Sequence, residues 1–148
     1  MSVSRKLLAV VPAAVILAGD LFLKNAAGGQ HCSLIPGILS LDYTLNSGFA
    51  LGLFPGTALP ATILSVLILG AVLFLFLRYS WNTGSLIGFG MVLGGALGNL
   101  YDRLMFSGVR DMFRLDFMHF YIFNLADTGV VAGVSLIVLF TLFAGKEQ

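Results

Sequence analysis

Three aspartates stand out because they lie at the edges of apolar segments, where a carboxylate is costly to keep. They are Asp102, Asp111 and Asp127, all within residues 94–127. Two carboxyl groups within hydrogen-bonding range cannot both ionise easily, so they share a proton and titrate as a pair. The ionised member can take a proton from water, while the protonated member polarises a carbonyl and later protonates a leaving amine. If Asp111 meets Asp127, the residues predict hydrolysis of a peptide bond without a covalent intermediate.

Other hydrolytic chemistries fit these residues less well. Lys24 is the only lysine expected near the acidic residues, and no serine is obviously paired with it as a nucleophile. His119 has no second histidine or cysteine at metal-ligand spacing, so we expect it to be structural and expect no zinc site or other cofactor. Cys32 is the only cysteine, which excludes an intrachain disulfide. We expect it to be a small buried apolar residue rather than a reactive thiol.

The composition indicates an integral membrane protein. Of the 148 residues, 58% are hydrophobic and 10% are charged, whereas a soluble domain carries about 25% charged residues. A membrane-spanning helix needs about 20 apolar residues, so the length allows four spans and one sizeable loop. The net charge of +1 excludes the basic surface typical of nucleic-acid binding. The sequence therefore predicts an all-α membrane protein with four transmembrane helices.

The apolar runs place the spans at about residues 7–23, 61–77, 84–104 and 122–144. The outer loops are then about residues 24–60 and 105–121, within a single domain of residues 1–148. The first run could also be a cleaved signal peptide, but charged residues interrupt its end and no good cleavage site follows, so we expect it to be retained. Asn124 and Asp127 share a face of the fourth span, with Asp127 about 7.5 Å inside it at 1.5 Å per residue.

Two outer segments alternate between apolar and polar residues, which predicts strands of a small sheet. The first is Leu39 to Asn46, and the second runs through residues 113–117. Extending the second alternation backward puts Asp111 on the apolar side with Val109. Burial there should raise the pKa of Asp111, which makes it a stronger candidate than a carboxylate on the wet side.

Spacing on the helices suggests which polar residues support one another. Asp20 and Lys24 share a face in the favourable acid-first order. The sequence leaves open whether they form a pair that reaches toward the membrane surface or a pair that supports the site. At the end of the third span, Asn99, Asp102 and Arg103 also share a face, and we expect Arg103 to pair with Asp102.

A glycine repeat in the third span predicts close helix packing. Gly90, Gly94 and Gly98 recur every four residues, with Gly95 beside them. Small residues at this spacing allow neighbouring helices to approach closely. The repeat needs no catalytic explanation.

The distribution of charge indicates orientation. Four spans put both termini on one side, together with the short hairpin between the second and third spans. That side holds nearly unpaired basic residues, whereas the basic residues of the other side all lie near acids. We therefore expect both termini in the cytoplasm and the acidic cluster near the outer face.

Five short motifs follow one another along almost the whole chain: Asp20-x-x-x-Lys24, Thr44-x-Asn46-x-Gly48, Gly94-Gly95-Ala96-x-Gly98-Asn99-x-x-Asp102-Arg103, Val109-x-Asp111 and Phe123-Asn124-x-Ala126-Asp127. In this order they resemble the motifs of lipoprotein signal peptidase, the type II signal peptidase of bacteria and an aspartic membrane protease. The resemblance implies that Asp111 and Asp127 are the catalytic dyad. It implies supporting or substrate-contacting roles for Asp20, Lys24, Asn46, Gly48, Asn99, Asp102, Arg103, Asn124 and Ala126.

The resemblance also implies a substrate and a location. The enzyme would remove the signal peptide from prolipoproteins, cutting just before a cysteine that already carries a diacylglyceryl group. It would work in the bacterial cytoplasmic (inner) membrane as a multi-pass protein, with a small outer sheet resting on the membrane surface. The implied partners are these precursors, membrane lipid and the inhibitory cyclic peptide globomycin, with no nucleic acid. We expect a monomer.

The chain departs from the usual family pattern at two places. Where the family reads close to AAFG, this chain has Phe49-Ala50-Leu51-Gly52, an apolar turn that suits a membrane surface or a ligand groove. Where the family reads VVDF, this chain has Val109-Arg110-Asp111-Met112-Phe113. Neither change touches a carboxylate, so they concern the shape of the groove and the position of the loop.

Two other functions use the same features. A small proton-coupled transporter would use the intramembrane acids as a relay, and would place such acids deep in several spans. A structural packing subunit would need the glycines and would tolerate replacement of the aspartates. The motif set favours the protease.

Overall fold

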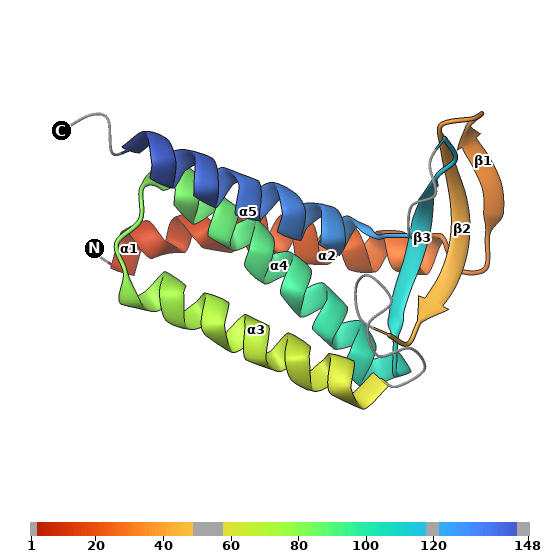
Figure 1. Cartoon of the computed structure of the whole chain (residues 1–148), viewed down its shortest axis with the longest axis horizontal. Coiled ribbons are helices and arrows are strands. Elements are labelled where there is room, and N and C mark those ends of the chain that lie inside the picture. Colours follow the sequence, from red (N-terminus) through yellow and green to blue (C-terminus); the bar gives the residue numbers. More distant parts are fainter. Residues whose placement is uncertain (1–2, 49–57, 118–121, 145–148) are drawn as a thin grey trace.

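The computed structural model describes residues 3–48, 58–117 and 122–144. The expectations for the apolar turn at residues 49–52 and for His119 lie outside these described residues. Figure 1 shows long helices lying side by side, with a small sheet gathered at one end. The first and last described helical turns lie at the opposite end, as an even number of spans requires.

The described residues contain four helices that are long and apolar enough to cross a membrane. The first span begins with α1 (Val3–Lys6) and the short helix η1 (Leu7–Ala9), and continues as α2 (Val10–Ala26). The others are α3 (Ala58–Arg78), α4 (Thr83–Phe106) and α5 (Leu125–Ala144). The predicted all-α membrane fold with four spans is confirmed.

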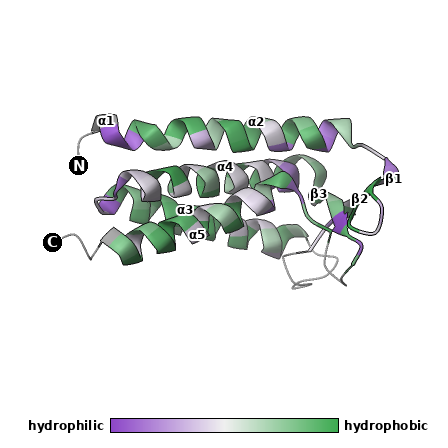
Figure 2. Cartoon of the chain, turned by 90° about the horizontal axis from the view of Figure 1, so that it is seen from above, coloured by the Kyte–Doolittle hydropathy of each residue, from purple (hydrophilic) through white to green (hydrophobic). Residues whose placement is uncertain are grey.

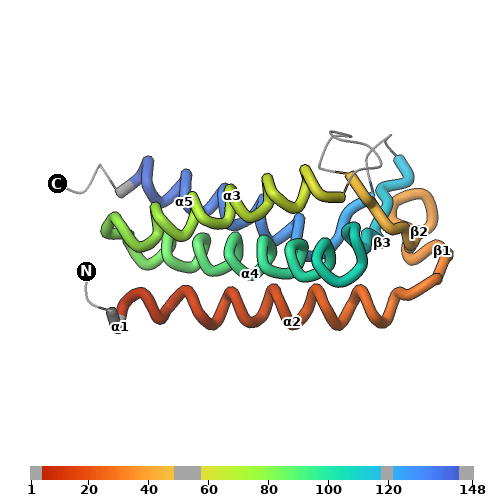
Figure 3. Tube along the Cα trace, turned by 90° about the horizontal axis from the view of Figure 1, so that it is seen from below, coloured from red at the N-terminus to blue at the C-terminus, as the bar shows by residue number. Residues whose placement is uncertain are grey.

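Helix α4 is the central element, packing against α2, α3 and α5 (Figure 3). Its glycines make this possible. A Cβ atom would lie 2.3 Å from the backbone oxygen of Ala9 at Gly90, and 2.4 Å from that of Ala13 at Gly94. At Gly95 it would lie 2.4 Å from the backbone oxygen of Ala126. Only glycine allows these approaches, so the predicted packing role of the repeat is confirmed.

The outer surfaces of the helices are apolar. Figure 2 shows hydrophobic residues along most of the helical length, with hydrophilic residues concentrated near helix ends and the sheet. Large apolar side chains such as Val11, Leu67 and Val131 are exposed on the bundle. In a soluble protein such a surface would aggregate, whereas in a bilayer it faces lipid.

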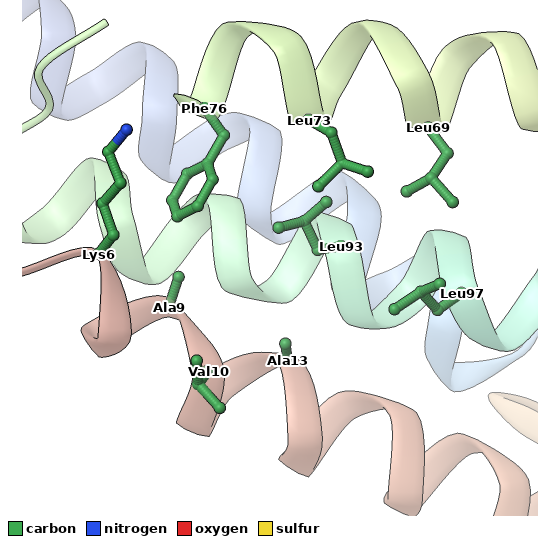
Figure 4. Close-up of a pocket in the computed structure, with 9 residues that line it drawn as sticks. All are labelled: Lys6, Ala9, Val10, Ala13, Leu69, Leu73, Phe76, Leu93 and Leu97. Atoms are coloured by element: carbon green, nitrogen blue, oxygen red, sulfur yellow. The ribbon is translucent and has the colours of Figure 1, made fainter. Parts of the chain in front are cut away.

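An apolar cavity of about 220 Å³ lies between α2, α3 and α4 (Figure 4). Its lining includes Leu69, Leu73 and Phe76 of α3, and Lys6 provides its only charged group. The Lys6 ammonium donates a hydrogen bond of 2.6 Å to the backbone oxygen of Leu77. None of the lining residues is an acid or an amide, so this cavity is not where the predicted chemistry would occur.

The sheet has three antiparallel strands in the order β1-β2-β3. They are β1 (His31–Ile35), β2 (Leu39–Asn46) and β3 (Val109–Leu115). Strand β2 has the predicted bounds, and β3 covers most of the second alternating segment. Strand β1 was not predicted. Cys32 on β1 is exposed, so the expectation of a buried cysteine is wrong: all five residues of this edge strand are exposed.

Strand β3 returns over the end of α4. The helix ends at Phe106, and the next residue, Ser107, takes a left-handed conformation with φ of 55°. This reversal brings the chain back as β3, whose residue Asp111 pairs with Thr44 of β2. On the other side of β3, Phe113 and Phe123 exchange backbone hydrogen bonds of 2.8 and 3.0 Å. Because Phe123 comes directly before Asn124, this contact joins β3 to the start of α5.

Candidate active site

The start of α5 is built from two of the predicted site residues. Asn124 caps the helix by accepting a hydrogen bond of 2.9 Å from the backbone nitrogen of Asp127. The Asp127 carboxylate in turn accepts one of 3.3 Å from the backbone nitrogen of Asn124. This reciprocal arrangement is a capping box. It orients both side chains relative to the helix axis.

Helix α5 begins at Leu125, three residues later than expected. Asp127 is therefore its third residue, about 3 Å along the helix instead of about 7.5 Å. The expected depth of this carboxylate was too great. It lies in the first turn, where the partial positive charge of the helix amino terminus favours a carboxylate.

Asp111 reaches the same place from β3, and only 3% of its surface is exposed. One carboxylate oxygen accepts a hydrogen bond of 2.6 Å from the Asn124 amide, and the other accepts one of 3.1 Å from the Asn46 amide. Burial and the nearby charge of Asp127 raise the pKa of Asp111 to about 7, although the two amide hydrogen bonds lower it. The expected rise in the pKa of this carboxyl is confirmed.

Asn99 completes the link between the two carboxyl groups. Its Nδ2 donates a hydrogen bond of 2.7 Å to Asp127. Its Oδ1 accepts hydrogen bonds of 3.1 Å from both Lys24 and Asn124. A charged ammonium can only donate, so Lys24 fixes which end of the Asn99 amide faces Asp127. The structure thus brings Asp111 and Asp127 together around two amide side chains.

Lys24 and Asp20 support the site and do not reach out to the membrane surface. Both side chains are fully buried and their charged atoms lie 2.6 Å apart. The second oxygen of Asp20 accepts a hydrogen bond of 2.9 Å from the backbone nitrogen of Ala126, at the start of α5. Gly98 lies against the pair, because a Cβ atom there would be 2.7 Å from Asp20. The first span therefore holds the amino end of the last one.

Asp102 is an anchor, as expected, and it also pairs with two cations that were not predicted to contact it. It lies 3.1 Å from the Lys24 ammonium and 2.8 Å from the Arg110 guanidinium. Arg103, which was expected to pair with it, donates to the backbone oxygen of Asn99 at 3.4 Å. Arg103 also lies within electrostatic range of three carboxylates, those of Asp102, Asp111 and Asp127. Spacing along the sequence does not predict the contact of Arg110 with Asp102, because the chain reverses direction between these two residues.

Two further residues were not anticipated as part of the site. Arg110 contacts Asp102 through its side chain and its backbone, and it donates a hydrogen bond of 2.7 Å to Asn25. The only sequence signal for Arg110 is its departure from the usual VVDF pattern, and Asn25 carries none beyond its place beside Lys24.

The remaining motif residues occupy tight positions. Gly48 donates its backbone N–H to Asn46 Oδ1 at 3.0 Å, which leaves the Asn46 amide nitrogen to face Asp111. Ala126 is fully buried between Asp20 and Gly95. In residues 3–48, 58–117 and 122–144, no group of three or more histidine, cysteine or acidic side chains is arranged to hold a metal ion.

Residues 12–143 match the model of the family described as signal peptidase II. The chain belongs to this family. Over its full length it is 31% identical to the lipoprotein signal peptidase of Lactobacillus johnsonii, covering all of that protein. It is 37% identical to that of Latilactobacillus sakei, over 95% of this chain and 97% of the relative.

Two solved structures of bacterial membrane enzymes are similar in fold. A bacterial membrane enzyme determined at 2.3 Å by the in meso method is similar with a TM-score of 0.83 and 26% identity, over 94% of this chain and 89% of that one. A second bacterial membrane enzyme, at 1.9 Å, gives a TM-score of 0.78 and 27% identity, over 88% of this chain and 90% of that one. Membership makes this chain a peptidase, and the four spans make it a multi-pass membrane protein.

Proposed function

We propose that this chain is an aspartic endopeptidase that removes the signal peptide from diacylglyceryl-modified prolipoproteins, cutting on the amino side of the lipidated cysteine. The observation that carries the proposal is the shared contact of both carboxyl groups with Asn124. This residue donates to Asp111 at 2.6 Å and exchanges hydrogen bonds with Asp127 at 2.9 and 3.3 Å. The similar proteins of Lactobacillus johnsonii and Latilactobacillus sakei, which are named lipoprotein signal peptidases, support the choice of substrate.

The two carboxyl groups have different environments, which suggests their roles. Asp111 is buried, with a pKa of about 7, so it carries the shared proton near neutral pH. Asp127 lies at a helix amino terminus and accepts hydrogen bonds from Asn99 and from the Asn124 backbone, so its carboxylate is oriented toward Asp111 and free of the shared proton that Asp111 carries. Asp127 is therefore the general base and Asp111 the general acid.

The reaction then proceeds in two steps. Asp127 takes a proton from a water molecule as the water oxygen attacks the scissile carbonyl carbon, and Asp111 donates its proton to the carbonyl oxygen. In the second step the C–N bond breaks. Asp127 gives its proton to the leaving nitrogen, while Asp111 recovers one from a hydroxyl of the tetrahedral intermediate. The products are a new carboxyl and a new amine, and the dyad returns to its starting state.

The position of the site suits a substrate that stays in the bilayer. All six aspartates lie in the sheet, contact it, or lie at or contact the start of α5. The exposed apolar side chains of the helices face lipid, where acyl chains and a signal helix would also lie. Water reaches a bilayer most readily at its interface, so this end of the bundle is where hydrolysis of such a substrate can occur.

Orientation follows from the separation of charge. Arg5, Lys6 and Arg78 lie at the end away from the sheet, and basic residues favour the cytoplasmic side. Both termini are then cytoplasmic, and the site faces outward in the bacterial cytoplasmic (inner) membrane.

The proposal extends to assembly and inhibition. The chain acts as a monomer of one domain, and globomycin inhibits it.

The clustering of the acids at one rim argues against a proton-coupled transporter. A relay across the membrane would need acids along the helices. In the described part of the chain, the buried carboxylates within the spans are Asp20 and Asp102, and both contact Lys24 near the sheet. Neither helps to build a path toward the opposite end.

The proposal is tested with purified enzyme and a diacylglyceryl-modified precursor peptide. Asp111→Asn and Asp127→Asn should each lower the cleavage rate by about 10²-fold or more. Asp116→Asn is the matched control, because Asp116 belongs to the same sheet end but contacts Ser40 and Arg114; it should keep the normal rate.

Three results would contradict parts of the proposal. Normal cleavage by either dyad variant would exclude the aspartic mechanism. Equal cleavage of the same peptide without its diacylglyceryl group would exclude lipid recognition. A product with a new terminus elsewhere than at the cysteine, seen by mass spectrometry, would exclude the proposed cleavage position.

A further inference from the structure

The second residue of the strand that carries Asp111 is a buried arginine. Arg110 is 7% exposed, and its guanidinium donates hydrogen bonds of 3.1 and 2.8 Å to Asp102 and one of 2.7 Å to Asn25. The ring of Phe106 stacks against the same guanidinium, with 4.3 Å between the ring centroid and Cζ. These contacts come from α2 and α4, so Arg110 ties β3 to two membrane spans.

Arg110 is held by its backbone as well as by its side chain. Its backbone nitrogen donates a hydrogen bond of 3.0 Å to the second oxygen of Asp102. A strand fixed at one side chain can still slide or rotate about its axis. A strand fixed at both side chain and backbone by one carboxylate cannot do either without breaking both contacts.

Arg110 and Asp111 point to opposite sides of β3, because successive side chains of a strand alternate. Arg110 meets Asp102 and Asn25, whereas Asp111 meets Asn46 and Asn124. The rotation of the strand that satisfies Arg110 is therefore the rotation that aims Asp111. A loosened Arg110 would let Asp111 turn away from its two amide donors.

We propose that Arg110 is a positioning residue that acts through Asp102 to hold the Asp111 carboxyl against Asn124 and Asp127. The inference rests on the proposed function, because it assigns Arg110 to the same reaction. Arg110 does not touch the reacting atoms. Its effect is to keep the acid of the dyad within reach of the scissile carbonyl, and a misplacement of about 1 Å can cost about 10²-fold in rate.

The guanidinium shape is part of this role. Arginine offers several N–H donors in a planar fork, so it contacts Asp102 and Asn25 at the same time. Lysine would keep the positive charge beside Asp102 but would supply a single donor point. Methionine would keep much of the length and remove both the charge and the hydrogen bonds. The series arginine, lysine, methionine therefore separates the contribution of charge from that of geometry.

The experiment compares full-length Arg110→Lys and Arg110→Met with wild type, using Arg114→Gln as the matched control. Arg114 is on the same strand and is also ion-paired, with Asp42 and Asp116, but its side chain is 46% exposed. Two kinds of measurement are made. Steady-state kinetics give kcat and KM for the lipidated precursor, per folded enzyme, and amide hydrogen exchange is followed across residues 109–113. Folded enzyme is counted from the fraction that unfolds cooperatively.

We expect Arg110→Met to lower kcat by about 10²-fold with KM unchanged, and to accelerate exchange across residues 109–113. Arg110→Lys should recover part of kcat, and Arg114→Gln should match wild type in both measurements. If Arg110→Met does not fold, Arg110→Lys alone decides, because it keeps the buried charge. Normal kcat per folded Arg110→Lys enzyme, or unchanged exchange in the Arg110 variants, would overturn the inference.

Asp111→Asn is measured in parallel so that the two proposals can fail separately. If Asp111→Asn cleaves normally, the proposed function fails. In that case accelerated exchange in the Arg110 variants still shows that Arg110 holds this strand, whereas unchanged exchange overturns that too. If Asp111→Asn is inactive and Arg110→Lys is fully active, the dyad stands and the role of Arg110 does not.

Discussion

Replacing Asp111 with asparagine should make the protein more stable above neutral pH while it abolishes activity. In the folded protein the pKa of Asp111 is about 7, whereas the ordinary value is 3.8. Between these pH values the unfolded chain releases the proton and the folded protein keeps it. The folded state therefore loses stability as the pH rises toward 7. Asparagine cannot ionise, so the variant avoids this loss.

The size of the effect follows from the same two values. From pH 5 to the folded pKa of about 7, the loss is 1.36 kcal/mol per pH unit, or about 3 kcal/mol in total. The stability of Asp111→Asn relative to wild type should rise by this amount between pH 5 and pH 8. In a chain of this length it corresponds to roughly 6 to 12 °C in the unfolding midpoint. The comparison between two pH values cancels any pH-independent cost of exchanging an oxygen for an amide group.

The assay is thermal unfolding in detergent, followed by the fluorescence of the single tryptophan, Trp81. Asp116→Asn is the control, because the pKa of Asp116 is shifted in the opposite direction to that of Asp111. Its hydrogen bond from Ser40 is the main reason that the pKa of Asp116 is lowered, so its removal should not stabilise the protein at pH 8. If the difference between the unfolding midpoints of Asp111→Asn and wild type stays constant from pH 5 to pH 8, the pKa of Asp111 is not raised in the folded protein and the reasoning fails.

Three other substitutions test the packing and the site. Gly94→Ala should destabilise the protein by about 1–3 kcal/mol, because its methyl group would lie 2.4 Å from the backbone oxygen of Ala13. Gly70→Ala, with no atom within 4 Å, is its control, and equal midpoints for the two would contradict the packing argument. Asn124→Ala should lower kcat by about 10²-fold in the precursor assay, because both Asp111 and Asp127 lose a hydrogen bond. A normal rate would show that the contacts of Asn124 with the two carboxyl groups are dispensable. Arg114→Gln should change the free energy of unfolding by less than about 1 kcal/mol, because its ion pairs are exposed, and a larger loss in a denaturation curve would refute this.

The sequence predicts the parts of the structure in which one face differs from the other. Strand β2 was expected at Leu39 to Asn46 and lies there, because its alternation is regular. The same period placed Asp111 on a buried face of β3, where it has only 3% of its surface exposed, but it did not predict that Arg110 and Met112 on the other face are buried as well. The glycine repeat of α4 predicted close packing for the same kind of reason.

Where neighbouring residues do not differ in burial, the residue pattern does not predict the secondary structure. Every residue of β1 is exposed, so His31 to Ile35 carry no alternating signal. Ile122 and Phe123 look like the start of a span because they are apolar. Instead, Phe123 pairs with β3, and the helix begins at Leu125.

Contacts between distant segments were the least predictable. Arg103 was the natural partner for Asp102 because it is adjacent. The reversal at Ser107 also brings Arg110 back onto Asp102, which spacing along the helix does not predict. Such a contact depends on how the chain turns in space, and neither hydropathy nor spacing records it.

The hydrogen bond from Ala126 to Asp20 joins residues that are 106 positions apart. On the proposed mechanism, Asp111 and Asp127 cannot take up their positions until the last span has packed against the first. The chain then becomes active only in the final step of its assembly in the bilayer, when the last helix is inserted. A newly made chain that still lacks its last helix is harmless to its surroundings, and it needs no inhibitory segment to keep it so.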